Sequence, residues 1–169
     1  EEAAVRLTSQ KILQLEKMAK QQKVTLDPVA LYRAKRGVVL FHEHTWGAFN
    51  SVGNPESPFV LHQWAYKKGL LDSAIYYTAK IEKELHSKLV RSGSIRVFNT
   101  SGRSRSAYVE LDAPAGFKGN IVVDDKKNKH AVQRLAGGKI AFIAADVPAN
   151  GFKTYKFGND RKTSSLAFN

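Results

Sequence analysis

The first part of the chain has apolar residues at helical spacing. From Glu1 to about Lys23 there is neither Gly nor Pro, and apolar residues recur at intervals of three, four or seven positions: Val5, Ile12, Leu15 and Ala19. Acidic residues open the segment, where they complement the positive end of a helix dipole. The pattern predicts an amphipathic helix with one buried face.

Two further helices are predicted from capping signals. Asp27 can cap a helix with Pro28 in its first position, and this helix continues through VALYRAKRGVVLF, weakened slightly by Gly37. Ser57 and Pro58 form a second cap-plus-proline pair. The helix that they start ends near RSGS and has an apolar stripe made of Leu71, Ala74, Thr78, Ile81, Leu85 and Leu89. Three helices of this kind predict an antiparallel bundle.

After Gly93 the pattern becomes that of strands. Six short segments rich in β-branched and aromatic residues are separated by Gly, Pro, Asn or Asp: SIRVFN, SAYVELD, NIVVDD, HAVQRL, KIAFIAAD and FKTYKF. They predict an antiparallel β-sheet or partial β-sandwich, and we expect the opening part of a larger β domain, because a lone sheet leaves one face and its edges open. The predicted fold class is α+β, with a three-helix bundle over residues 1–92 and a β domain over residues 93–169.

Composition narrows the possible chemistry. The chain has 169 residues, is 43% hydrophobic and contains no cysteine. Disulfides and thiolate metal sites are therefore excluded, and any metal must be held by His, Asp, Glu or backbone oxygens. The sequence shows no initiator methionine, no basic-then-apolar leader and no apolar run long enough to span a bilayer. We expect a mature form or an excised fragment without a membrane segment.

The formal net charge of +12 raises the question of a nucleic-acid partner. The basic residues are scattered, with small clusters at Lys67-Lys68, Arg103/Arg105 and Lys126-Lys127, and they form no RNA- or DNA-binding motif. We therefore interpret the charge as a solvated basic surface and expect no nucleic-acid partner.

The segment LFHEHTWGAFNSVGNP, residues 40–55, has the densest set of reactive side chains. His42 and His44 would point to the same side of a strand but nearly opposite sides of a helix. In a helical or turn geometry, His42 and Glu43 can both reach a site at the helix end. Alternatively, these polar groups only satisfy backbone groups in a helix-terminal loop. A zinc site needs three or four protein ligands, and the remaining histidines are isolated: His62, His86 and His130.

Two other features have both a functional and a structural interpretation. Trp46, Phe49, Trp64 and Tyr66 could form a surface on which sugars stack, or they could belong to the core or an interface. Asn99-Thr100-Ser101 fits an N-glycosylation acceptor formally, and we expect a chance match. The sequence contains no Gly-rich phosphate loop, Ser-His-Asp order or Gly-x-Ser-x-Gly elbow.

The order of these features resembles the central part of family 38 glycoside hydrolases, the α-mannosidases. The shared order is a helix leading into His-acid-x-x-x-Gly, a long capped helix, then RVFNTSGRSRSAYVEL and DVPANGFKTYKF. The resemblance covers essentially the whole chain; its motifs are short, and their order and spacing make the match fairly specific. It implies a three-helix bundle whose His-Asp-x-x-x-Gly segment faces the active site of a preceding barrel domain.

Residue by residue, the resemblance assigns two site residues. His42 falls on the histidine that binds the catalytic zinc, and Glu43 falls on the aspartate that contacts substrate hydroxyls; Gly47 matches the family glycine. The glutamate adds a methylene and HTW replaces small residues, which puts the sugar and linkage in doubt. The strand motifs match at Val97-Phe98-Asn99, with Thr100 in place of the usual proline, and at Val147-Pro148, Gly151, Phe152 and Tyr155.

The resemblance also implies what this chain lacks. The family's nucleophile, general acid and other zinc ligands come from the N-terminal barrel, to which no segment here corresponds. We therefore expect one wall of a zinc-dependent, retaining glycosidase site acting on an α-mannoside-like carbohydrate, with the isolated chain inactive and free of zinc. A second hypothesis is a non-catalytic carbohydrate-binding or interaction module, and a third is a basic nucleic-acid-binding domain.

Overall fold

The computed structural model describes residues 1–43, 49–89 and 93–160. The chain divides into two compact units, Glu1–Leu89 and Val90–Asn169, which we call the helical unit and the β unit. The boundary predicted after residue 92 falls beside residues 90–92, which lie outside the described ranges. None of the helices in the described ranges is long and apolar enough to cross a membrane.

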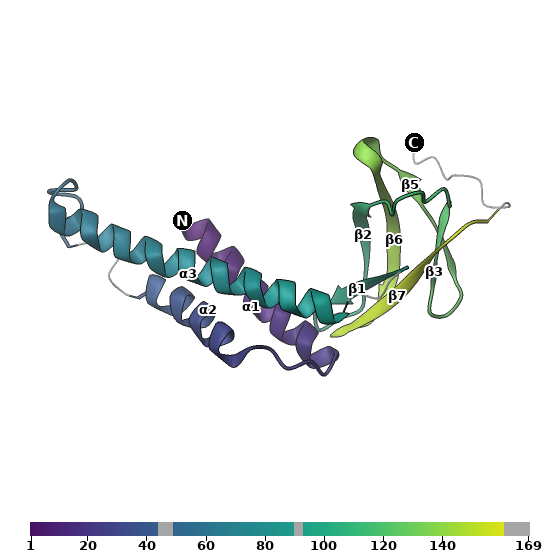
Figure 1. Ribbon diagram of the computed structural model, residues 1–169, viewed down its shortest axis with the longest axis horizontal. Coiled ribbons are helices and arrows are strands. Elements are labelled where there is room, and N and C mark those ends of the chain that lie inside the picture. Colours follow the sequence, from purple (N-terminus) through teal and green to yellow (C-terminus); the bar gives the residue numbers. More distant parts are fainter. Residues whose placement is uncertain (44–48, 90–92, 161–169) are drawn as a thin grey trace. The chain divides into compact units, whose positions relative to one another are not determined.

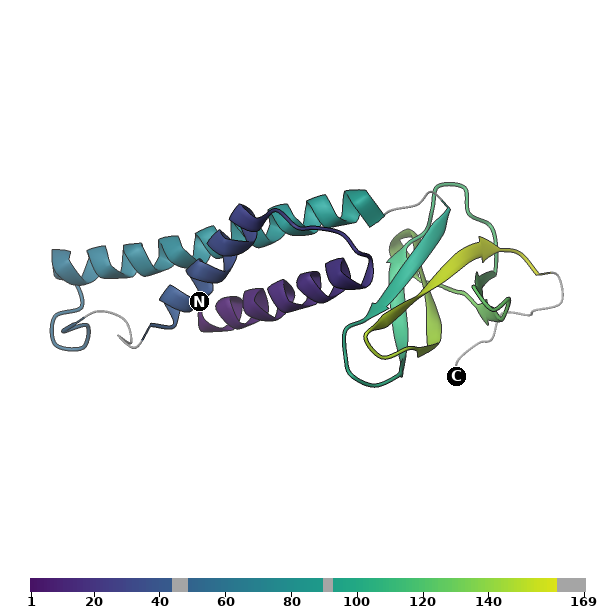
Figure 2. The ribbon, with the colours of Figure 1, turned by 90° about the horizontal axis from the view of Figure 1, so that it is seen from below.

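The helical unit consists of three helices in which consecutive members run in opposite directions (Figures 1 and 2): α1 (Glu2–Gln21), α2 (Pro28–Phe41) and α3 (Pro58–Leu89). The predicted caps form, because the Asp27 carboxylate accepts hydrogen bonds from Val29 N (2.9 Å) and Ala30 N (3.2 Å). Ser57 Oγ accepts one from Val60 N at 3.4 Å. The antiparallel bundle predicted from the sequence is confirmed.

The predicted apolar stripes are the core of the helical unit. The α1 positions Val5, Ile12, Leu15 and Ala19 are all buried, as are the predicted α3 positions from Leu71 to Leu89. Helices α2 and α3 pack closely at Gly37, where an added Cβ would lie 2.5 Å from the backbone oxygen of Leu70 and 2.9 Å from Ala74 Cβ. Gly37 therefore permits a close helix–helix approach, although it weakens the intrinsic helix propensity of α2.

The β unit contains two antiparallel sheets (Figure 1). The four-stranded sheet has the order β1 (Ser94–Asn99), β7 (Gly151–Gly158), β3 (Ile121–Asp124), β4 (Lys129–Ala131), and the three-stranded sheet has the order β2 (Arg105–Asp112), β6 (Lys139–Val147), β5 (Gln133–Arg134). Side chains from both sheets pack into one hydrophobic core that includes Val122, Ile140, Phe142, Val147 and Tyr155. The predicted fold class, helices followed by an antiparallel partial sandwich, is confirmed.

One predicted strand is two strands in the structure. The segment HAVQRL pairs with β3 through β4, and after Val132 it pairs with β6 through β5. The amide of Val132 donates to Asn120 O at 2.8 Å, and the Val132 side chain is buried in the core. The segment therefore passes from one sheet to the other at Val132, which closes a corner of the sandwich.

Candidate functional site

The end of α2 and the first half of α3 form a groove with a volume of about 450 Å³. Its walls contain an acid, an imidazole, an amide, a cation and exposed aromatic rings: Glu43, His62, Gln63, Lys67, Phe59 and Tyr66, with Leu40 and Leu70. Phe59 is 55% exposed and Tyr66 is 63% exposed. The groove thus combines apolar ring surface with hydrogen-bonding groups, as binding sites for polar organic ligands do.

Helical spacing brings the α3 wall together. Phe59 is followed three and four positions later by His62 and Gln63, Tyr66 comes four and three positions after these two, and Leu70 four positions after Tyr66. This spacing places them on one face of the helix. Gln63 Oε1 accepts a hydrogen bond from the backbone N–H of Phe49 at 3.1 Å, which ties the chain before α3 to this face. The α3 helix is therefore the rigid element that positions most of the groove.

His42 caps the C-terminus of α2, where the sequence predicted it to lie. Its backbone N–H donates to Val38 O at 3.2 Å, and its φ of −86° and ψ of 4° belong to a turn rather than to a strand. The side chain is 41% exposed, and its Nδ1 lies 3.8 Å from Glu2 Oε1 of α1. The Phe41 ring meets the His42 ring edge-to-face at 5.8 Å. His42 is accessible, but it does not line the groove.

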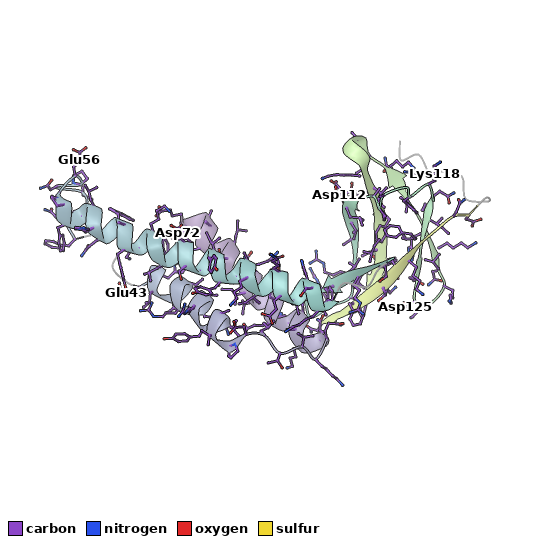
Figure 3. The ribbon with its side chains drawn as sticks, in the orientation of Figure 1. Glu43, Glu56, Asp72, Asp112, Lys118 and Asp125 are labelled. Carbon is purple, nitrogen blue, oxygen red and sulfur yellow. The ribbon has the colours of Figure 1, made fainter. Side chains whose placement is uncertain are left out.

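Glu43 follows His42 in the same turn and does line the groove. Its backbone N–H is 3.4 Å from Leu40 O, and in Figure 3 the residue lies at the end of α2, beside the first half of α3. The groove also contains His62, which sequence reasoning treated as isolated. The turn geometry directs the predicted substrate residue, Glu43, and the predicted metal residue, His42, toward different neighbours.

The predicted sugar-stacking set is only partly brought together. Tyr66 lines the groove, whereas Phe49, 81% exposed, and Trp64, 41% exposed, do not. Trp46, His44 and Gly47 lie outside the described residues. Phe59, His62 and Gln63 were missed, although their spacing with Tyr66 could have shown that they share a helix face.

Within residues 1–43, 49–89 and 93–160, no group of three or more His, Asp or Glu side chains could hold a metal ion. His42 can supply one imidazole ligand at an exposed helix end, and a tetrahedral zinc site needs three or four protein ligands. Of the ligands that such a site needs, His42 could supply one, and the assignment of His42 as a ligand stays a prediction.

The β unit contains a buried ionic cluster at the β3–β4 turn. Asp124, whose side chain is 1% exposed, accepts hydrogen bonds from Lys126 N at 2.9 Å, Asn128 N at 2.8 Å and Asn128 Nδ2 at 3.0 Å. His130 Nε2 lies 3.3 Å and Lys153 Nζ lies 3.8 Å from its Oδ2. Burial alone would raise the pKa of Asp124, but these hydrogen bonds outweigh it and lower the pKa to about 2.

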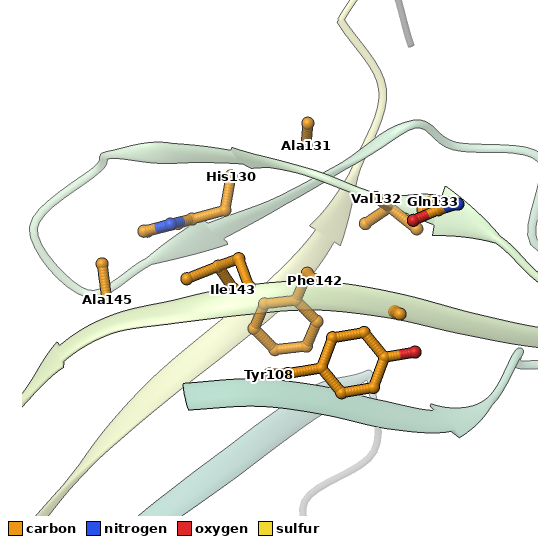
Figure 4. Close-up of a pocket in the computed structure, with 9 residues that line it drawn as sticks. Tyr108, His130, Ala131, Val132, Gln133, Phe142, Ile143 and Ala145 are labelled. Carbon is orange, nitrogen blue, oxygen red and sulfur yellow. The ribbon is translucent and has the colours of Figure 1, made fainter. Parts of the chain in front are cut away.

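A smaller cavity of about 170 Å³ adjoins this cluster (Figure 4). His130 lines it with apolar side chains of the two sheets, including Val132, Phe142 and Ile143, and with Tyr108. An Asp–His pair can activate a nucleophile, but none of the described residues that line this cavity is a Ser, Thr, Cys or Lys. The His130 ring also packs edge-on against the buried Tyr155 ring at 5.4 Å. We therefore assign Asp124 and His130 a structural role.

The formal glycosylation acceptor is a structural residue as well. Asn99 is 7% exposed, and its Nδ2 donates to Arg103 O at 2.8 Å and to Val147 O at 3.0 Å. Its Oδ1 accepts from the backbone and hydroxyl of Ser101. A glycan on this nitrogen would replace one of its two N–H donors and so break at least one of these hydrogen bonds in a buried environment, which favours the chance match expected from the sequence.

The strand motifs on which the expected resemblance to the α-mannosidases depends also have structural roles in the β unit. Val147 and Tyr155 are core residues, and the amide of Gly151 donates to Pro148 O at 3.2 Å in the turn between β6 and β7. Chemistry at these positions is therefore not indicated, and the candidate site is the helical groove with the adjacent His42. In comparisons with known proteins, no family model, no curated protein and no solved structure matches this chain.

Proposed function

We propose that this chain is part of a zinc-dependent, retaining glycoside hydrolase resembling the family 38 α-mannosidases. The main support for the proposal is the arrangement at the end of α2. There an exposed His42 is followed directly by Glu43, which lies in the wall of a groove with exposed aromatic rings. In this proposal the helical unit forms one wall of the active site. The nucleophile, the acid/base and the other zinc ligands belong to a barrel domain outside this sequence.

Each residue has a distinct part in the proposed site. His42 supplies one neutral imidazole, and its position at a helix C-terminus leaves the ring accessible to ligands from another domain. Glu43 accepts hydrogen bonds from sugar hydroxyls, and Phe59 or Tyr66 packs against the apolar face of a sugar ring. Zinc, when bound, orients sugar hydroxyls and polarises them as a Lewis acid.

Comparing the intact enzyme with this chain tests the proposal. We expect the intact enzyme to hydrolyse an aryl α-mannoside, to lose that activity with a chelator and to regain it with zinc. The isolated 169-residue chain should show no turnover, because retaining hydrolysis needs two carboxylates placed on the scissile bond. Turnover by the purified chain, or full activity of the intact enzyme after zinc removal, would contradict the proposal.

A second candidate function is a non-catalytic carbohydrate-binding module, and the exposed rings of Phe59 and Tyr66 favour it. If the groove binds sugars in the isolated chain, Tyr66→Ala should weaken that binding about tenfold, since a stacked aromatic ring contributes roughly 1–1.5 kcal/mol. Tyr76→Ala is the matched control, because Tyr76 is 64% exposed on the same helix but does not line the groove.

The readout is titration calorimetry with mannose and α-linked mannobiose. Two results together would establish the binding module instead of the glycosidase. The first is saturable binding to the isolated chain that Tyr66→Ala weakens and Tyr76→Ala leaves unchanged. The second is the absence of hydrolysis by the intact protein. Equal weakening by both substitutions would show that the groove is not the sugar site.

A further inference from the structure

A second hollow lies between α2 and α3, with a volume of about 360 Å³. Its rim contains two arginines, two tyrosines and a serine: Tyr32, Arg33 and Arg36 from α2, and Ser73 and Tyr77 from α3. The buried residues Gly37 and Leu70 complete the lining, at a point where the two helices pack closely. We call this hollow the arginine cleft. It shares only Leu70 with the groove of the proposed function.

Arg33 is held in place by Tyr77 of the facing helix. Its guanidinium lies over the Tyr77 ring, 5.2 Å from the ring centroid, and its Nη1 donates a hydrogen bond to the Tyr77 hydroxyl. A guanidinium has five N–H donors, so most of them remain available to a ligand. Because the side chain is already ordered, less conformational entropy is lost when a ligand binds.

Arg36 carries a charge that nothing in the described parts of the chain compensates. Its side chain is exposed and forms neither an ion pair nor a hydrogen bond with residues 1–43, 49–89 or 93–160. The neighbouring Lys35, in contrast, is paired with Glu16 at 2.6 Å. Among the described residues, no Asp or Glu lines the arginine cleft, so none of them neutralises its positive potential locally.

We infer that the arginine cleft binds a small oxyanion, such as a phosphate, sulfate or carboxylate, attached to a ring. Arg33 and Arg36 are three positions apart and therefore share one helix face, and guanidinium groups bind oxyanions with paired, charge-assisted hydrogen bonds. The Ser73 hydroxyl can donate a further hydrogen bond. The Tyr32 ring, 65% exposed, offers a surface against which the ring of the ligand packs. The volume suits a ligand of monosaccharide or nucleobase size.

Titration of the 169-residue chain with phenyl phosphate, followed by amide NMR, tests this inference. We expect saturable shifts centred on Arg33, Arg36 and Ser73, weaker binding of inorganic phosphate, and no saturable binding of phenol. Arg36→Gln should weaken phenyl phosphate binding about tenfold or more, since a hydrogen bond to a charged group contributes about 1.5–3 kcal/mol. Arg36→Lys should recover only part of the affinity, because an ammonium cannot bind in a bidentate manner.

Arg6→Gln is the control, since it removes the same charge from an exposed position of α1, where Arg6 pairs with Glu2 at 3.9 Å. Its effect should stay below about twofold. Equal weakening by Arg6→Gln and Arg36→Gln would show that binding depends only on the net charge of the protein and would overturn the inference. Tight binding of phenol, or phosphate shifts that do not saturate, would overturn it as well. The Arg36 side chain has no hydrogen-bond or ion-pair partner among the described residues that its replacement would leave unpaired, so loss of folding is not expected to obscure the result.

Discussion

Replacing Asp124 with alanine is expected to lower the free energy of unfolding of the β unit by about 3–5 kcal/mol, since removing one partner leaves an uncompensated buried charge. The substitution leaves Lys153, whose side chain is 11% exposed, without its carboxylate. It also leaves two backbone amides of the β3–β4 turn, at Lys126 and Asn128, without an acceptor. The expected loss of stability is large because several hydrogen-bond donors share the Asp124 carboxylate as their acceptor.

Asp125→Ala is the matched control, because Asp125 is the next residue and faces solvent (Figure 3). Its replacement should change the stability by less than about 0.5 kcal/mol. Urea unfolding followed through the amide NMR signals of Ile140 and Tyr155 reports on the β unit, and the signals of Leu15 and Ile81 report on the helical unit. A similar loss in both variants, or a loss shared equally by the helical signals, would contradict the assigned role of Asp124.

The same carboxylate should make the stability of the β unit depend on pH. Its pKa is about 2 in the folded chain against 3.8 for a free side chain. Its contribution is therefore complete above about pH 5 and is lost as the pH falls through the folded pKa. The difference corresponds to about 2 kcal/mol. This part of the pH dependence should be absent from Asp124→Ala and retained in Asp125→Ala.

Gly37→Ala is expected to destabilise the helical unit by about 1–2 kcal/mol, although alanine is the better helix former. The added Cβ would lie 2.5 Å from a backbone oxygen of α3, which cannot move aside as a side-chain tip can. The cost of separating the two helices therefore exceeds the gain in helix propensity.

Gly69→Ala makes the same chemical change on the facing helix with the opposite expected sign. Gly69 is exposed, and an added Cβ would meet no atom of the described residues within 4 Å apart from its own chain neighbours and the local backbone of α3. We expect a stabilisation of about 0.5–1 kcal/mol, mainly from reduced freedom of the unfolded chain. Thermal unfolding monitored by helical circular dichroism measures both variants. Stabilisation by both substitutions would show that α2 and α3 do not pack as closely as the structure shows.

The helices could be predicted from the sequence because their signals are local. The caps at Asp27 and Ser57 and the stripe from Leu71 to Leu89 each depend on residues within a few turns of one another, and the structure confirms them. The structural role of Gly37 could not be predicted, since the absence of a side chain there matters because of the α3 backbone at Leu70, more than 30 residues away in the sequence. From the sequence alone, the glycine was only a weak point in a helix.

Strand pairing in the β unit and the composition of the groove could not be predicted from local sequence patterns. One segment predicted as a single strand, residues 130–135, belongs to two sheets, because β4 pairs with β3 while β5 pairs with β6. The sequence of a strand does not determine which strands it pairs with. The groove depends on how α2 ends against α3, so Phe59 and His62 were missed while Tyr66 was named. The roles of His42 in zinc binding and of Glu43 in substrate binding remain predictions from the resemblance.

The central claim is that His42 holds one position of a zinc site, and the zinc content of the intact enzyme tests it most directly. Because His42 lies in a turn rather than in a strand, His42 and His44 are not expected to bind the same ion. We predict that His42→Ala lowers both the zinc bound per chain, measured by inductively coupled plasma mass spectrometry, and the hydrolysis of an aryl α-mannoside. We expect His44→Ala to retain its zinc. Full zinc occupancy and the wild-type rate in the His42→Ala enzyme would contradict the account.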